Sequence, residues 1–142
     1  MSSGGLGPVV ATAVVAMGGG VGAAVRYWIA RVVPAMTDGH GMPWATLIVN
    51  TAGSAAIGVA LHFAASAERG GHESSEFLRL LLVTGLLGGL TTFSALSGEI
   101  VELVRHERVG AAIFVAGLNL GLGVGVCGLA YWISGVITRA IG

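Results

Sequence analysis

The sequence predicts an all-α membrane protein with four transmembrane helices and a break in the third. Hydrophobic residues make up 54% of the 142 residues and charged residues only 10%, whereas a soluble domain usually carries about 25% charged residues. The mean hydropathy is +0.86. Polar segments divide the chain into four apolar runs, each longer than the roughly 20 residues needed to cross a bilayer. We therefore expect residues 1–142 to form a single membrane domain.

Glycine, proline and charged residues mark the ends of the four runs. The first two runs are expected at about 8–33 and 44–67, with PAMTDGHGMP between them. ERGGHESSE precedes the third run at 77–104, where we expect Glu76 to cap the helix N-terminus. RHER separates the third run from the fourth, at 110–136. A signal peptide is a rival interpretation of the first run, but that run lacks a basic leader and is longer than a typical signal core.

The third run is too long for one straight span and carries weak helix formers near its middle. A helix over residues 77–104 would rise about 42 Å at 1.5 Å per residue, against about 30 Å of hydrocarbon. The stretch GLLGGLTTFSALSGE predicts a break near 88–93. Unwound backbone at membrane depth is tolerated only inside protein or beside a wet cavity. Its carbonyls can bind a cation, and a half-helix N-terminus favours an anion.

Five small or polar residues and Ile57 share one face of the second run. They recur at i, i+4, i+7, i+8, i+11 and i+12: Thr46, Asn50, Gly53, Ser54, Ile57 and Gly58. Asn50 is the strongly polar member, and either bonds across a helix interface or belongs to a functional site. GxxxG pairs elsewhere favour close helix packing: Gly18 with Gly22, Gly85 with Gly89, and Gly121 with Gly125.

Several function classes lose support from composition and spacing. A formal net charge of +0 gives no argument for binding nucleic acid. Cys127 is the single cysteine, and no Cys/His cluster has the spacing of zinc ligands. No nucleophile–base pair is evident from spacing, so we expect no enzyme activity and no catalytic residue.

The arginines are nearly balanced between the two sides of the membrane. With the N-terminus inside, one side carries Arg69, Arg79 and Arg139, and the other carries Arg31, Arg105 and Arg108, with Arg26 near it. The chain contains no lysine. Proteins with one fixed orientation normally show an excess of positive charge inside. The balance therefore favours a chain that inserts either way up and forms an antiparallel dimer, although counts this small can also arise by chance.

Three segments resemble the signature segments of the small bacterial fluoride channels, called Fluc or CrcB. They are GGGVGAAVRY, ATLIVNTAGSAAIG and GLLGGLTTFSALSGE, and GLNLGLG in the fourth run also fits. The resemblance covers nearly the whole chain. It implies a dual-topology dimer in the bacterial inner membrane, with two antiparallel pores that export fluoride down its electrochemical gradient and so relieve fluoride toxicity.

The resemblance also implies roles for particular residues. A structural sodium ion at the dimer interface would be held by the backbone carbonyls of Gly88 and Thr91. Asn50 and Phe93 would line the fluoride path. Fluoride is small and strongly hydrated, so a pore must replace its water with donors such as an amide, a hydroxyl or the positive edge of an aromatic ring.

Three further residues belong to the implied path. Ser94 and Glu99 would lie along a polar track that continues from Phe93. Glu99 could be protonated, hold a donor in place, or cap a solvated helix end. Arg26 would either raise the anion concentration in a vestibule or extend towards lipid headgroups.

Two departures from the family pattern qualify the expectation of a homodimer. The family usually has TTFSTFS, whereas Ala95 and Leu96 here replace a threonine and a second phenylalanine. The chain could therefore pair with a different subunit that keeps the second ring.

The rival functions are a four-span multidrug transporter and a non-transporting subunit. The transporter needs a carboxylate in its first span, and this chain has none before Asp38.

Overall fold

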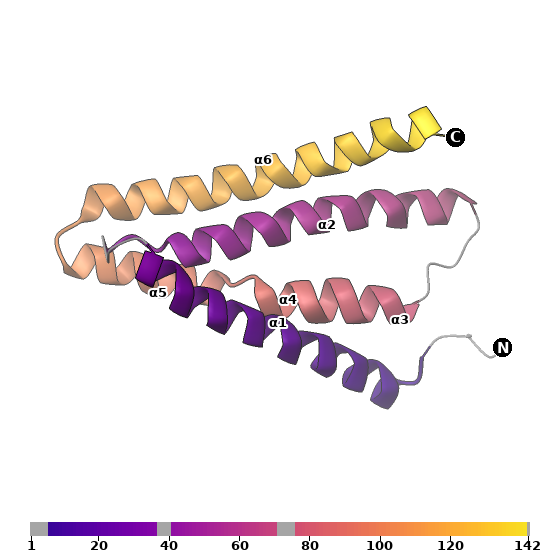
Figure 1. Ribbon diagram of the computed structural model, residues 1–142, viewed down its shortest axis with the longest axis horizontal. Coiled ribbons are helices and arrows are strands. Elements are labelled where there is room, and N and C mark those ends of the chain that lie inside the picture. The colour runs from indigo at the N-terminus through magenta and orange to yellow at the C-terminus, as the bar shows by residue number, and fades with distance from the viewer. Residues whose placement is uncertain (1–5, 37–40, 71–75, 142) are drawn as a thin grey trace.

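The computed structural model describes residues 6–36, 41–70 and 76–141, and it confirms four membrane-spanning helices. All four are long and apolar enough to cross a bilayer. The third span consists of several segments, and its path is not straight (Figure 1). The elements in chain order are α1 (Pro8–Met36), α2 (Trp44–Gly70), α3 (Glu76–Leu78), η1 (Arg79–Leu87), α4 (Gly88–Leu90), α5 (Phe93–Arg105) and α6 (Val109–Ile141).

The helix α6 runs along α2 for most of the length of the bundle (Figure 1). Gly58 makes this possible, because a Cβ atom there would overlap the carbonyl oxygen of Cys127. Further along, the buried ring of His62 lies 3.2 Å from Thr138 Oγ1, measured from Nε2. The Thr138 hydroxyl already donates to the Ser134 carbonyl, so it accepts from His62. This contact thus joins two unbroken helices, α2 and α6.

The helix α1 packs against η1 and α4 through the predicted glycine pairs. A Cβ atom on Gly18 would overlap the Leu81 carbonyl oxygen, and one on Gly22 would overlap that of Leu86. Gly85 and Gly89 approach α1 from the other side, against Val15, Gly18 and Gly19. Close approach of two backbones is the expected use of small-xxx-small pairs in membranes. The packing prediction is confirmed for these two pairs.

Gly121 and Gly125 do not pack against another part of the described chain. Nothing lies within 4 Å of a Cβ atom built on either residue. The prediction that this pair packs helices together is therefore wrong within the single chain. The reason is geometric, because α6 turns its Gly58-contacting face towards α2 and these two glycines lie elsewhere on its surface.

The third span departs from α-helical geometry at two places. Residues 79–87 are π-helical, a rare and wider winding that is frequent at functional sites. Thr91 and Thr92 are then extended, with φ and ψ of −77° and 150° and of −152° and 117°. The extended pair lies inside the predicted 88–93 interval, and the break is consistent with that prediction.

The helix α5 packs on the first part of α6 through a small apolar core. Its buried members are Leu96, Leu103, Ala112 and Val115. The turn between the two helices contains Glu107 at φ 60° and is closed by Arg108 N–H donating to the Leu103 carbonyl at 2.9 Å. This core fixes the direction in which α5 leaves the break.

Glu76 does not act as the predicted cap of its own helix. It is the first residue of α3, and its Oε2 accepts a hydrogen bond of 2.8 Å from Leu6 N–H. Its carboxylate therefore ties the residues preceding α1 to the start of the third span.

Candidate functional site

The candidate site is built around the break at Thr91 and Thr92. Thr91 closes the preceding helix, because its N–H and its hydroxyl both donate to the Leu87 carbonyl, at 3.0 and 2.9 Å. Thr92 caps α5, because its Oγ1 accepts from Ala95 N–H at 3.1 Å. Threonine suits both positions, since its hydroxyl can replace a backbone partner. The helix thus ends and restarts within two residues.

Asn50 of α2 holds the break through its side-chain amide. Its Oδ1 accepts from Thr92 N–H at 2.9 Å, and its Nδ2 lies 3.4 Å from the Thr92 carbonyl. Nδ2 also donates to Oδ1 of Asn119 at 3.1 Å. A single side chain therefore satisfies both backbone groups of Thr92.

The same hydrogen bonds remove two helical donors from their usual carbonyls. If the helix continued, Thr92 N–H would donate to Gly88 and Ala95 N–H would donate to Thr91. The first donates to Asn50 and the second to Thr92 Oγ1. The carbonyls of Gly88 and Thr91, the two residues that the resemblance assigns to sodium, are therefore among those at the break that lack their usual helical donors.

Arg26 of α1 reaches the third span just before the break. Its Nε donates to the Gly89 carbonyl at 3.2 Å, and the side chain is half-buried. Its contact with α4 is therefore specific, whichever of the two expected roles it has.

Glu99 lies two turns into α5 and is linked to α2. The Thr46 hydroxyl donates to its Oε1, whereas Oε2 is buried without a hydrogen-bond partner. Thr46 is itself buried, at 6% exposure. Thr46 and Asn50, one turn apart on α2, therefore contact the third span at Glu99 and at the break.

Phe93 and Ser94 begin α5 and point outward. Phe93 is 82% exposed, and the Ser94 hydroxyl lies 3.2 Å from the Thr92 hydroxyl. Leu96, at the position of the second family phenylalanine, is only 8% exposed and belongs to the core between α5 and α6. The two family ring positions therefore differ in this chain in direction as well as in side chain.

Asn119 is a site residue that the sequence analysis did not single out. It is buried in α6, accepts from Asn50, and donates from Nδ2 to the Val115 carbonyl at 3.0 Å. An amide in the long apolar segment from Val109 to Ile141 is the signal that could have found it.

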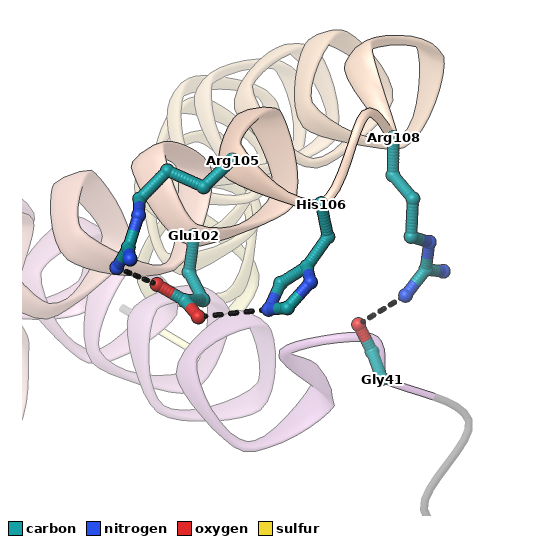
Figure 2. Close-up of polar contacts among 5 residues, drawn as sticks. All are labelled: Gly41, Glu102, Arg105, His106 and Arg108. Atoms are coloured by element: carbon teal, nitrogen blue, oxygen red, sulfur yellow. Dashed lines mark hydrogen bonds and ion pairs between the residues drawn. The ribbon is translucent and has the colours of Figure 1, made fainter.

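A recess of about 590 Å³ opens at the C-terminal end of α5. Its lining includes Glu99, Glu102, His106 and Arg108. Glu102 bonds to Arg105 at 3.0 Å and to His106 at 2.9 Å, and Arg108 donates to the Gly41 carbonyl at 3.1 Å (Figure 2). The recess thus connects the Glu99 carboxylate with the charged end of the bundle.

Within the described residues, no group of three or more His, Cys, Asp or Glu could hold a metal ion.

Residues 13–133 match the family described as CrcB-like protein, Camphor Resistance (CrcB). The chain belongs to this CrcB-like family. Curated relatives named fluoride-specific ion channel FluC include one from Thermus thermophilus, 38% identical over 87% of this chain and 94% of its own length. One from Allorhizobium ampelinum is 44% identical over 78% of this chain and 85% of its own. One from Rhizobium etli is 42% identical over 82% and 90%.

The family membership confirms the resemblance found in the three segments. The relatives are ion channels by name and not enzymes, which agrees with the expectation that the chain has no enzyme activity. The chain is a multi-pass protein of the plasma membrane, because it has four membrane-spanning helices and belongs to this channel family. The comparisons do not favour a multidrug transporter.

Proposed function

We propose that this chain forms a fluoride-selective channel whose path runs past the break in the third span. The observation that carries the proposal is the extended pair Thr91–Thr92, whose backbone is held by Asn50 and followed directly by the outward ring of Phe93. Backbone of this kind within the membrane is tolerated where it is buried in protein or lines a water-filled cavity, and broken helices form ion sites in many transporters. The names of the relatives supply the ion.

The donors around the break suit a small anion. Fluoride must exchange its water for other donors, and Asn50 Nδ2, the Ser94 hydroxyl and the positive edge of the Phe93 ring are available types. Asn50 Nδ2 lies 3.4 Å from the Thr92 carbonyl, which is long for an N–H···O bond. Fluoride can replace that weak acceptor while the bond from Thr92 N–H to Oδ1 is kept.

Glu99 extends the polar path towards the recess. A carboxylate repels fluoride, so its role is to hold the Thr46 hydroxyl or to carry a proton that donates to the ion. The unpartnered Oε2 is the atom from which such a proton would be donated. Arg26 lies near the break, where its Nε donates to the Gly89 carbonyl.

Sodium is the proposed structural ion, bound by the carbonyls of Gly88 and Thr91. Both have lost their usual helical donors to side chains of Asn50 and Thr92. A hard cation prefers oxygen ligands of this kind. Two carbonyls are too few for a complete shell, so a second subunit would supply the rest. Replacing sodium with potassium during purification and assay should lower fluoride flux, and undiminished flux would argue against the ion.

An antiparallel dimer is the proposed assembly. Only 11% of the most apolar window of the third span is buried within the chain, and Gly121 and Gly125 are left open for a partner. Three lysines added to either terminus should force one orientation and abolish flux from a homodimer. Reporters at the C-terminus should detect both orientations of the unmodified chain, and one clear orientation would contradict dual topology.

A paralogous partner is the proposed alternative to the homodimer. Phe93 is exposed, whereas Leu96 is packed in the core and offers no second ring. A subunit that keeps the second phenylalanine would complete the pore built on Phe93 of this chain. Stronger flux after co-expression with such a paralogue would support this pairing.

Growth in fluoride tests the function as a whole. The chain is expressed in a bacterium that has been made fluoride-sensitive by deletion of its own fluoride exporters. We expect growth to be restored by the wild type and lost with Phe93→Ile. Phe77→Ile, which changes an exposed ring at the start of the same span, should behave as wild type. No rescue by a chain that reaches the membrane, alone or with a paralogue, would contradict a fluoride channel.

A further inference from the structure

One face of α1 approaches the third span so closely that Arg26 can reach its backbone. Gly18, Gly22 and Arg26 follow each other at intervals of four residues and therefore share this face. A Cβ atom on Gly22 would lie 2.8 Å from Leu90 N, directly beside the break. Arg26 is one turn further on, and its Nε donates to the Gly89 carbonyl at 3.2 Å. The glycines thus set the distance that the arginine needs.

The Gly89 carbonyl is one of the last four of the helix that ends at Leu90. Such carbonyls have no intrahelical donor and need another partner. The Arg26 Nε–H supplies that partner for the Gly89 carbonyl. Within the described residues, no side chain donates to the carbonyl of Gly88 or of Thr91. Arg26 therefore distinguishes Gly89 from these two.

Successive helical carbonyls lie about 100° apart around the helix axis. Fixing the Gly89 carbonyl towards α1 consequently directs the Gly88 carbonyl to another side of α4. That separation keeps the Arg26 charge and a cation bound by Gly88 from competing for the same space. Asn50 fixes Thr92 from α2, so the break is held from two helices.

We propose that Arg26 is a positioning residue, which fixes the turn at Gly89 so that the carbonyls of Gly88 and Thr91 remain directed towards the cation. The inference rests on the proposed function, because it concerns the sodium site of the channel. It assigns the effect of Arg26 to its Nε–H donor and not to its charge.

Two substitutions separate the donor from the charge. In Arg26→Gln the amide nitrogen is four bonds from Cα, as Nε is in arginine, so the donor is kept and the charge is lost. In Arg26→Lys a methylene occupies that position and the charge is kept. Arg31→Gln is the matched control, because Arg31 is exposed on the same helix and bonds to Tyr27.

The readout is the sodium concentration that gives half-maximal fluoride flux from proteoliposomes. Losing this hydrogen bond should raise this concentration about tenfold in Arg26→Lys. Arg26→Gln and Arg31→Gln should both stay close to wild type. The opposite ranking, with Arg26→Lys normal and Arg26→Gln impaired, would overturn the inference and assign Arg26 to attraction of the anion.

Hydrogen–deuterium exchange over residues 90–94 gives a second readout that needs no flux. Exchange should be faster than wild type in Arg26→Lys and unchanged in Arg26→Gln. Equal exchange in wild type and Arg26→Lys, or faster exchange in Arg26→Gln, would overturn the inference even if one variant failed to assemble. Absence of fluoride flux from the wild type would instead count against the proposed function, while the exchange result would still decide the role of Arg26.

Discussion

The contact between α1 and the third span differs from the contact between α2 and α6 in how the backbone is used. Both rely on glycine, at Gly22 in the first and at Gly58 in the second. The helices α2 and α6 are unbroken over 27 and 33 residues, so their backbone groups are satisfied within each helix. The third span is π-helical and then extended. Its backbone needs partners from other helices.

This difference separates a scaffold from a site within one small bundle. The side chains that cross from α2 to α6 bond to other side chains, as His62 does with Thr138. The side chains that reach the break bond to backbone, as Asn50 does with Thr92 and Arg26 with Gly89. In a membrane an unpaired backbone group is costly, so the side chains at the break determine its shape. Changes there should alter function more than changes in the α2–α6 contact.

The largest effect should come from Asn50→Asp. The substitution keeps the acceptor for Thr92 N–H but places a carboxylate oxygen against the Thr92 carbonyl and Asn119 Oδ1. It also replaces an anion donor with a group that repels fluoride. We expect flux to fall at least about a hundredfold, which corresponds to about 2.7 kcal/mol, while dimer assembly in detergent changes little.

Thr138→Val is the matched change in the α2–α6 contact, where it removes the acceptor of His62. Its flux should remain within about twofold of wild type, because a membrane hydrogen bond contributes only about 0.6–2 kcal/mol to stability. Loss of assembly in Asn50→Asp with normal flux from the remaining dimer would mean that Asn50 is only a packing residue.

A smaller effect is expected from alanine at the two contact glycines. Gly22→Ala and Gly58→Ala each place a methyl group against backbone and should destabilise the protein by about 1–3 kcal/mol. Only Gly22→Ala should also lower the flux of each folded dimer, because it moves Arg26 away from Gly89. Thermal unfolding in detergent and flux normalised to folded protein measure the two effects.

Gly20→Ala is the control, since nothing lies within 4 Å of its Cβ position. It should be neutral or slightly stabilising, because alanine is the better helix former by about 1 kcal/mol. Equal flux defects in Gly22→Ala and Gly58→Ala would contradict the separation of site from scaffold.

An effect on stability of similar size is expected at Thr46. Thr46→Val removes the hydroxyl that donates to Glu99 and leaves that carboxylate without the partner of Oε1. We expect a loss of about 1–3 kcal/mol in unfolding free energy, whereas Thr46→Ser keeps the hydroxyl and should lose less. Thermal unfolding would reveal the difference, and equal melting of both variants would show that the hydroxyl contributes nothing.

The composition and the polar segments between the apolar runs are enough to predict four spans, because a bilayer requires long apolar helices. The break is predictable from the clustering of Gly88, Gly89, Thr91 and Thr92 in an overlong run. The π-helical stretch is not, since nothing in RLLLVTGLL distinguishes a π-helix from an α-helix. Arg26 donating to Gly89 is equally hidden, because a carbonyl acceptor leaves no mark on the sequence.

The choice of candidate residues was predictable only through the family pattern. Asn50 alone is compatible with packing, and its two-sided contact with Thr92 is visible only in the fold. Leu96 shows the limit of the pattern, since its burial with Val115 depends on how α5 rests on α6. The partner of Asn50, Asn119, lies 69 residues away along the chain and no spacing rule connects them.

Fluoride efflux from proteoliposomes is the most direct test of the channel itself. Vesicles containing the purified wild type are loaded with potassium fluoride. An ionophore then lets potassium cross the vesicle membrane and balance the charge, and the release of fluoride is followed with a fluoride electrode. We expect release well above that of protein-free vesicles, no matching release of chloride, and loss of release with Asn50→Asp. Folded wild-type dimers that release no fluoride, alone or with a paralogous subunit, or that release fluoride and chloride equally, would contradict a fluoride-selective channel at the break.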